Sequence, residues 1–175
     1  DAAIAGMSVT TRVMMFVSSA LIGFGQGYQL VCSFNYGANL KQRVKEGYFF
    51  CIKYGTIFLI LIGVICFAFT DRIVGWFRDD ADVIAVGSVA LRFQASVLFL
   101  TATIVTTNMM LQAIGKGIKA SITSSARNGI FFIPLILTLP RFFGLFGVEI
   151  TQTIADILTF TVSLPFALSE LKKMK

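Results

Sequence analysis

The sequence has no histidine and few charged residues. Only 14% of its 175 residues are charged, whereas soluble domains average about 25%. Without histidine, the chain cannot form a Ser-His nucleophile, a His-ligated zinc site or an imidazole proton relay. Its cysteines, Cys32, Cys51 and Cys66, are far apart and form no C-x-x-C pair, so neither a metal centre nor a redox motif is indicated. We therefore expect no enzyme, no metal and no cofactor.

Apolar residues take the place of the missing charge. They make up 56% of the sequence, and the mean hydropathy is +0.81. A water-soluble globule of this composition would expose larger apolar patches than soluble monomers carry. The composition therefore excludes a soluble enzyme domain, a disordered segment and a disulfide scaffold. It predicts an all-α integral membrane protein built as a polytopic helical bundle.

Five apolar segments are each long enough to cross a bilayer, which takes about 20 helical residues. No proline- or serine-rich linker separates them, so we expect one membrane domain over residues 1–175. The first and third segments exceed the length of a straight span, which predicts tilt or a kink. We expect a helix to end at Pro140, because proline disrupts a helix interior. The expected spans cover about residues 2–34, 48–69, 83–114, 121–139 and 146–168.

Basic residues divide unequally between the two sides of this arrangement. Three of them, Arg72, Arg78 and Arg141, fall on one side together with most of the acidic residues, including Asp79 and Glu149. The positive-inside rule places the richer side in the cytoplasm. We expect a cell-membrane protein with a cytoplasmic C-terminus, in contact with lipid and not with nucleic acid. The ten basic residues of the richer side are Lys41, Arg43, Lys45, Lys53, Lys116, Lys119, Arg127, Lys172, Lys173 and Lys175.

Polar residues recur along two of the expected spans. Their spacing is mostly seven residues, which returns a helix to nearly the same face. Such a stripe either joins helices through hydrogen bonds worth about 0.6 kcal/mol each or lines a water-filled cleft, and the sequence leaves both readings open. The candidate cleft-lining residues are Gln94, Thr101, Asn108 and Gln112 in the third span, and Ser8, Arg12, Ser19 and Gln26 in the first.

Four charged residues fall inside spans: Arg12, Arg92, Arg127 and Asp156. A charge at the centre of a membrane helix costs about 2.5–3.5 kcal/mol on insertion scales. Asp156 lies about ten residues into the fifth span and so near the midplane, where it must be protonated, paired or open to a water-filled cavity. Depth along the helices makes Arg127 the first candidate partner and Arg92 the second. Either the pair is structural, or Asp156 couples transport to a proton or cation.

Several longer stretches resemble a known family. The stretch GFGQGYQLVCSFNYGA (Gly23–Ala38), with RVKEG (Arg43–Gly47) after it, is similar to part of the C-terminal lobe of MATE (multidrug and toxic compound extrusion) transporters. LQAIGKGIKASITSSARNGIFFIPLILTLP (Leu111–Pro140) and FGLFGVEITQTIAD (Phe143–Asp156) resemble later parts of that lobe. The resemblance implies helices eight to twelve of a twelve-helix, two-lobe protein. The chain begins with Asp1 and not with Met, so we expect it to be a piece of a longer protein. The resemblance implies that helix seven and the N-terminal lobe of the same protein are missing from this piece.

The resemblance also implies a function. It points to part of a bacterial secondary active antiporter that exports drugs or small organic cations, driven by a proton or sodium gradient through alternating access. In the family, a sodium site uses acidic residues of helices seven and ten, but the matching segment 83–114 contains neither Asp nor Glu. Two alternatives stay open. One is a lipid-linked precursor flippase of the same superfamily, which needs a cationic cleft to which Arg12 and Arg92 would contribute. The other is a non-transporting membrane scaffold or relic.

Overall fold

The structure is a computed structural model that describes residues 2–77 and 80–174. Arg78, Asp79 and Lys175, which the expected topology counts, lie outside the described residues together with Asp1. All regular elements within the described ranges are helical. They are α1 (Ala2–Gly37), α2 (Lys41–Ala68), α3 (Thr70–Phe77), α4 (Ala81–Val97), α5 (Leu100–Ala113), α6 (Gly117–Ser125), the π-helical turn η1 (Ala126–Ile130) and α7 (Phe132–Lys173).

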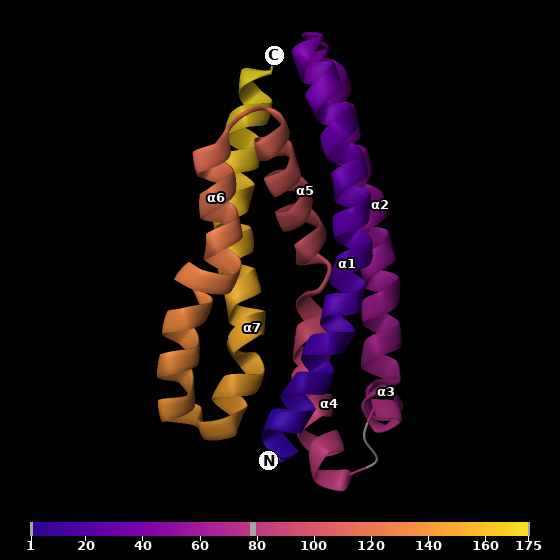
Figure 1. Ribbon diagram of the computed structural model, residues 1–175, viewed down its shortest axis with the longest axis vertical. Coiled ribbons are helices and arrows are strands. Elements are labelled where there is room, and N and C mark those ends of the chain that lie inside the picture. The colour runs from indigo at the N-terminus through magenta and orange to yellow at the C-terminus, as the bar shows by residue number, and fades with distance from the viewer. Residues whose placement is uncertain (1, 78–79, 175) are drawn as a thin grey trace.

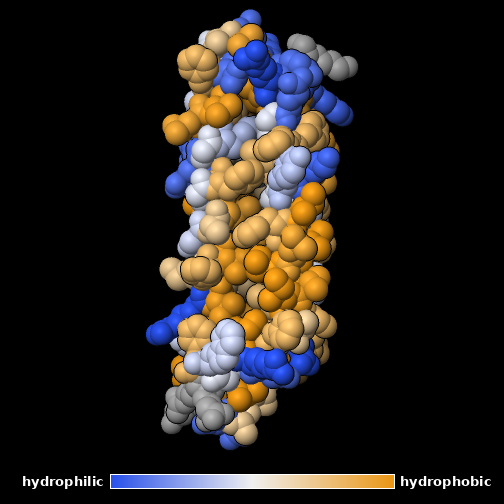
Figure 2. Space-filling model, turned by 90° about the vertical axis from the view of Figure 1, so that its right-hand side faces the viewer, coloured by the Kyte–Doolittle hydropathy of each residue, from blue (hydrophilic) through white to orange (hydrophobic). Residues whose placement is uncertain are grey.

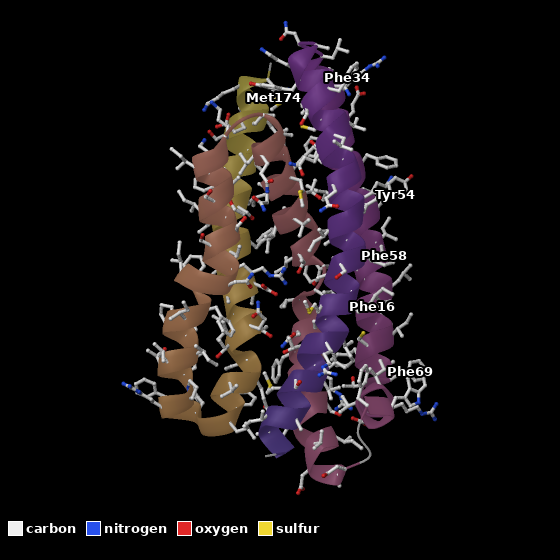
Figure 3. The ribbon with its side chains drawn as sticks, viewed as in Figure 1. Phe16, Phe34, Tyr54, Phe58, Phe69 and Met174 are labelled. Atoms are coloured by element: carbon white, nitrogen blue, oxygen red, sulfur yellow. The ribbon has the colours of Figure 1, made fainter. Side chains whose placement is uncertain are left out.

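The helices form an elongated bundle with the two termini at opposite ends (Figure 1). Figure 2 shows a broad apolar band between two polar ends on the face formed by α1 and α2. Large aromatic side chains project outward from these two helices (Figure 3), among them Phe16, which is 81% exposed, and Phe58. Three helical stretches are long and apolar enough to cross a membrane, and the bent pair α4–α5 makes a fourth. The chain is therefore a polytopic all-α membrane bundle, as its composition predicts.

The longest of these stretches, Gly117–Lys173, folds back on itself at Gly144. The backbone there has φ 58° and ψ −135°, a conformation open essentially to glycine alone. The two arms of α7 run antiparallel on either side of this turn (Figure 1). The candidate stretches number three, or four with the bent pair α4–α5, instead of the five expected, because the fourth and fifth expected spans are arms of this one stretch.

The expectation that a helix ends at Pro140 is wrong. The first arm of α7 continues through Pro140 to the turn at Gly144. Proline removes one hydrogen bond from a helix, but this alone does not reverse the chain. The reversal needs a residue with positive φ, and Gly144, four residues after Pro140, supplies it. A Cβ on Gly147 would lie 2.5 Å from the carbonyl carbon of Leu139, so the two arms are in backbone contact just after the turn.

The third expected span is broken between α4 and α5. The two helices meet at an angle of 59°, with Leu98 and Phe99 at the junction. No proline lies there. The Ser96 hydroxyl donates to the Phe93 carbonyl oxygen at 2.6 Å, and this type of local bond competes with the helix ladder and often bends a helix. The residues on either side of the bend therefore do not share one helical face.

A second irregularity precedes Pro134. In η1 the Phe131 amide donates to the Ala126 carbonyl oxygen, five residues back, at 3.1 Å. Pro134 has no amide hydrogen, and its ring crowds the carbonyl four residues before it, which explains why the turn widens here. Such π-helical turns are frequent at functional sites.

Helices α1 and α4 pack at close range near the N-terminus. A Cβ on Gly6 would lie 2.9 Å from the Gly87 amide nitrogen, and the Thr10 hydroxyl lies 3.1 Å from the carbonyl oxygens of both glycines. Small residues and a buried hydroxyl are the usual means by which membrane helices approach closely. This contact holds α1 and α4 together as one wall of the cavity described next.

Candidate functional site

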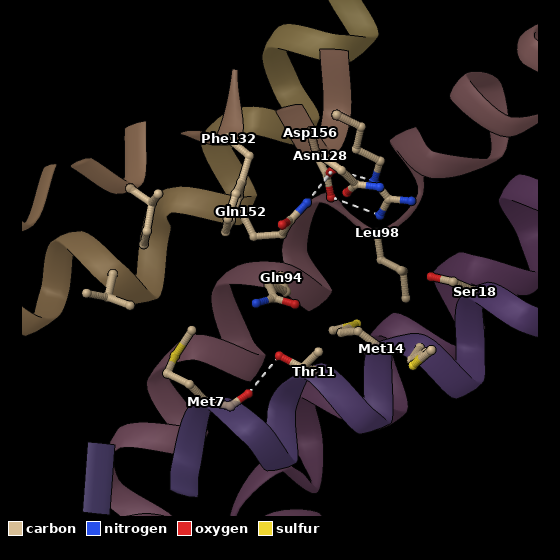
Figure 4. A pocket seen from close by; sticks show the side chains of 14 residues that line it. Met7, Thr11, Met14, Ser18, Gln94, Leu98, Asn128, Phe132, Gln152 and Asp156 are labelled. Atoms are coloured by element: carbon tan, nitrogen blue, oxygen red, sulfur yellow. Dashed lines mark hydrogen bonds and ion pairs between the residues drawn. The ribbon is translucent and has the colours of Figure 1, made fainter. Parts of the chain in front are cut away.

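A cavity of about 360 Å³ lies between α1, α4, η1 and both arms of α7 (Figure 4). Its size is within the range of 300–1,000 Å³ typical of small-molecule sites. The apolar part of the wall includes three methionines of α1, and thioether side chains adapt to ligands of different shape. The principal lining residues are Met7, Met14, Met15, Gln94, Leu98, Arg127, Asn128, Gln152 and Asp156.

An ion pair between Arg127 and Asp156 forms the polar part of the wall. The Arg127 Nε donates to Asp156 Oδ1 at 2.8 Å, and Nη2 lies 3.4 Å from Oδ2. Gln152 donates its side-chain amide to the same Oδ1 at 3.0 Å. The Asp156 side chain is 7% exposed and that of Arg127 23%. Depth along the helices predicted Arg127 as the first candidate partner of Asp156, and the two residues are paired in the structure.

Local structure brings these groups together. Arg127 and Asn128 belong to the widened turn η1, while Gln152 and Asp156 are four residues apart on the second arm of α7 and so lie on one face. The hairpin at Gly144 places that arm opposite η1. Because guanidinium and carboxylate compensate each other, the pair brings no net charge to the cavity.

Arg92 lies elsewhere, so its expected role as the second partner of Asp156 is wrong. Its Nη2 is 3.3 Å from both carboxylate oxygens of Asp71 on α3, and its side chain is 48% exposed. Gln94, two residues further along α4, faces the cavity instead. Each residue of a helix is rotated by about 100° from the one before it, so Arg92 and Gln94 point in different directions. Arg12 is exposed on α1 and does not line the cavity either. The cationic cleft that a flippase requires is thus not assembled from these arginines.

The third-span stripe divides between two environments. Gln94, on α4, lines the cavity. Beyond the bend, Thr101 is 1% exposed and its hydroxyl has no hydrogen-bond partner in the described chain. The Asn108 amide donates to the Ser124 hydroxyl at 2.9 Å, and the Gln112 carbonyl accepts from Gln29 at 3.3 Å. Asn108 and Gln112 therefore join helices in this structure.

The first-span stripe lies outside this cavity. Ser8, Arg12, Ser19 and Gln26 are all exposed along α1. The Ser19 hydroxyl donates to the Met15 carbonyl of its own helix at 2.8 Å. That this stripe lines a cleft stays a prediction.

Sequence reasoning missed several residues of the cavity, above all Asn128, Gln152 and the methionines of α1. Gln152 could have been found, since it precedes Asp156 by one helical turn. The methionines carried no signal, because they are ordinary residues of an apolar span. Within residues 2–77 and 80–174, no group of three His, Cys, Asp or Glu side chains could hold a metal ion.

Comparison with known proteins gives relatives for this fold. The multidrug export protein MepA of Staphylococcus aureus strain MSSA476 is 29% identical over 160 residues, covering 89% of this chain and 34% of the relative. The chain thus spans about a third of the length of the relatives it matches. Among solved structures, the outward-facing conformation of a multidrug resistance MATE family transporter of the MOP superfamily has a TM-score of 0.90 at 20% identity. The inward-facing conformation has a TM-score of 0.89 at 19% identity.

The two structural matches establish the fold. They cover 98% and 99% of this chain, and 39% and 42% of the matched chains respectively. The MatE family model matches residues 1–138, well over half of the sequence. The chain therefore belongs to the MatE family of multidrug and toxic compound extrusion transporters.

Proposed function

We propose that this chain is part of the C-terminal lobe of a secondary active exporter of drugs and small organic cations, and that the cavity between α1, α4 and α7 receives the cargo. The observation that carries the proposal is the buried Arg127–Asp156 pair in the wall of a methionine-rich cavity. The name of MepA, a multidrug export protein, favours the same substrate class.

The pair suits a cycle in which cations replace one another. The Arg127 guanidinium faces both oxygens of Asp156, so a cationic cargo that binds this carboxylate competes with it. A cationic cargo that displaces the guanidinium takes over the carboxylate, and a proton that arrives on Asp156 releases either partner. Competition of this kind is what exchange of a cation against a proton requires. The methionines of α1 then supply apolar contact that fits cargoes of different shape.

Alternating access completes the proposal. Two lobes rock against each other around a central site in repeat-built transporters. The same lobe fold occurs in an outward-facing and an inward-facing relative, which supports a lobe that moves as one body. The partner of this chain would then be the N-terminal lobe and helix seven of the same protein. We place it in the bacterial cell membrane with the basic end, including the C-terminus, in the cytoplasm.

The test uses the full-length protein in a drug-sensitive bacterial host loaded with ethidium. We expect efflux that stops when a protonophore collapses the proton gradient. Asp156→Asn, which keeps the size of the side chain but removes its charge, should abolish this efflux at unchanged membrane expression. Ethidium accumulation equal to that of cells with empty vector, at confirmed expression, would overturn the proposal.

A further inference from the structure

An apolar groove lies between α1 and α2, on the outer surface of the bundle. Its volume is about 370 Å³, and it shares no residue with the cavity described above. Buried Leu21 and Gly55 form its floor. Exposed aromatic side chains form its rims, and two of them, Tyr54 and Phe58, project outward from α2 in Figure 3. The lining residues are Ala20, Leu21, Phe24, Tyr54, Gly55 and Phe58.

Lys53 stands next to this groove without an acidic partner. Its side chain is exposed, and its Nζ lies 5.9 Å from the centre of the Tyr54 ring. It makes neither an ion pair nor a hydrogen bond with any residue that the structure describes. The one acidic residue of α2, Glu46, accepts a hydrogen bond from Gln42 at 3.1 Å. At a rise of 1.5 Å per residue it is about 10 Å away from Lys53 along the helix.

Lys53 lies at one boundary of the apolar part of α2. No charged residue follows it before Asp71, a stretch of about 27 Å at the helical rise. This length is close to the thickness of the hydrocarbon core, about 30 Å, so Lys53 lies at the level of the lipid headgroups. From Phe58 the groove continues towards the middle of the bilayer along Leu61 and Ile65, which are exposed on the same side of the helix.

We infer that the groove binds an acyl chain of an anionic glycerophospholipid whose phosphate group pairs with Lys53. Charge complementarity carries the assignment, because an exposed ammonium group without an acidic partner lies at the depth of the phosphates. Basic pockets between membrane helices on the cytoplasmic side bind such headgroups. The Tyr54 ring suits the boundary, since it presents an apolar face to the chain and a hydroxyl to the headgroup.

This lipid site goes beyond the proposed function. It takes from that proposal only the placement of the basic end in the cytoplasm, which assigns the lipid to the inner leaflet. A chain seated in the groove contacts α1 and α2 at the same time and reaches their buried floor. Lipid elsewhere on this face meets the exposed side chains of the helices alone. The site should therefore be distinguishable from the surrounding bilayer by its occupancy.

Photolabelling tests the site. The full-length protein is reconstituted in phosphatidylcholine nanodiscs that contain a small share of phosphatidylglycerol with a diazirine in the middle of one acyl chain. After irradiation, peptide mass spectrometry should find the adducts concentrated on the peptides that contain Phe24 and Phe58. The same diazirine on phosphatidylcholine, which has no net charge, should label these peptides about fivefold less, as expected for one lysine at an anionic lipid. Equal labelling by the two probes overturns the inference.

Removing the charge of Lys53 should have the same effect as removing that of the lipid. Lys53→Gln should lower labelling by the phosphatidylglycerol probe to the level of the phosphatidylcholine probe, and Lys53→Arg should retain it. Arg43→Gln is the matched control, since it removes an exposed positive charge from the same helix outside the groove. Because Lys53 has no acidic partner, Lys53→Gln should keep the melting temperature of the wild type in detergent. Unchanged labelling of Lys53→Gln, or an equal loss in Arg43→Gln, contradicts the site.

Filling the groove tests the acyl chain separately. Ala20 is exposed at the rim, so Ala20→Phe places a ring over the groove without entering the core. It should lower the labelling of the Phe58 peptide, whereas Ala68→Phe, at an exposed alanine of α2 outside the groove, should not.

None of these measurements requires transport. A protein that exports nothing and still shows the concentrated adducts fails the proposed function and keeps the lipid site. A working exporter whose adducts are spread evenly over the exposed face loses the lipid site alone.

Discussion

Arg127 and Asp156 are 29 residues apart in the sequence, yet the Arg127 Nε lies 2.8 Å from Asp156 Oδ1. The two residues belong to a widened helical turn and to the returning arm of a helical hairpin. Their pair closes one side of the cavity, so the geometry of the hairpin and the chemistry of the cavity depend on each other.

Removing Arg127 and removing Asp156 should lower the stability of the protein by different amounts. Arg127→Gln leaves Asp156 buried and unpaired, for which buried pairs predict a loss of about 3–5 kcal/mol. Asp156→Asn leaves an arginine that is 23% exposed and can take up water from the cavity, so its loss should be smaller. The double variant should be more stable than Arg127→Gln alone. Thermal unfolding of the purified full-length protein measures this, and strictly additive losses would show that the two side chains are not coupled.

The hairpin should be sensitive to single methyl groups. Gly144→Ala forces alanine into a glycine-only backbone conformation, at a cost of about 1–3 kcal/mol. Gly147→Ala should be at least as harmful, because its Cβ would lie 2.5 Å from the Leu139 carbonyl group. Gly23→Ala is the matched control, since no atom lies within 4 Å of the added Cβ. Melting temperatures that fall equally for all three variants would contradict this account of the turn.

Glu170 should make stability depend on acid pH. Lys119 donates to its carboxylate and is the largest influence that lowers its pKa below the ordinary value of 4.5, while burial opposes this and Lys173 adds to it. A carboxyl whose pKa is lower in the folded state stabilises the fold above its ordinary pKa and loses this contribution as the pH falls through the folded value. Glu170→Gln should therefore lower the melting temperature at pH 7 and lose this effect progressively below about pH 4.5. Exposed Glu46→Gln is the control, and a difference between Glu170→Gln and wild type that does not change with pH would refute the linkage.

The proposed orientation predicts which end impermeant thiol reagents reach. In intact cells, cysteine at exposed Arg141 should react from outside, whereas cysteine at exposed Gln42 should react only after permeabilisation. The native Cys32, Cys51 and Cys66 are buried and should give little background. The reverse pattern would invert the topology.

Much of the fold follows from the sequence because lipid leaves a chain few choices. Apolar length predicts the membrane helices, and depth along them led to the Arg127–Asp156 pair. The bend at Leu98 was not predictable in the same way, since it depends on a local serine bond and not on proline. The prediction that Gln94 and Thr101 share one face assumed a straight helix. Because the helix bends between them, only Gln94 faces the cavity.

The central claim, that cargo binds in the cavity between α1, α4 and α7, is tested most directly by protection of a cysteine placed at Gln94. In the full-length transporter this cysteine should react with a small aqueous thiol reagent, and a lipophilic cation that the protein exports should slow the reaction. Cysteine at Thr101, a position 1% exposed, should react little with or without the cation. An unchanged rate at Gln94, at cation concentrations that saturate export, would contradict the claim.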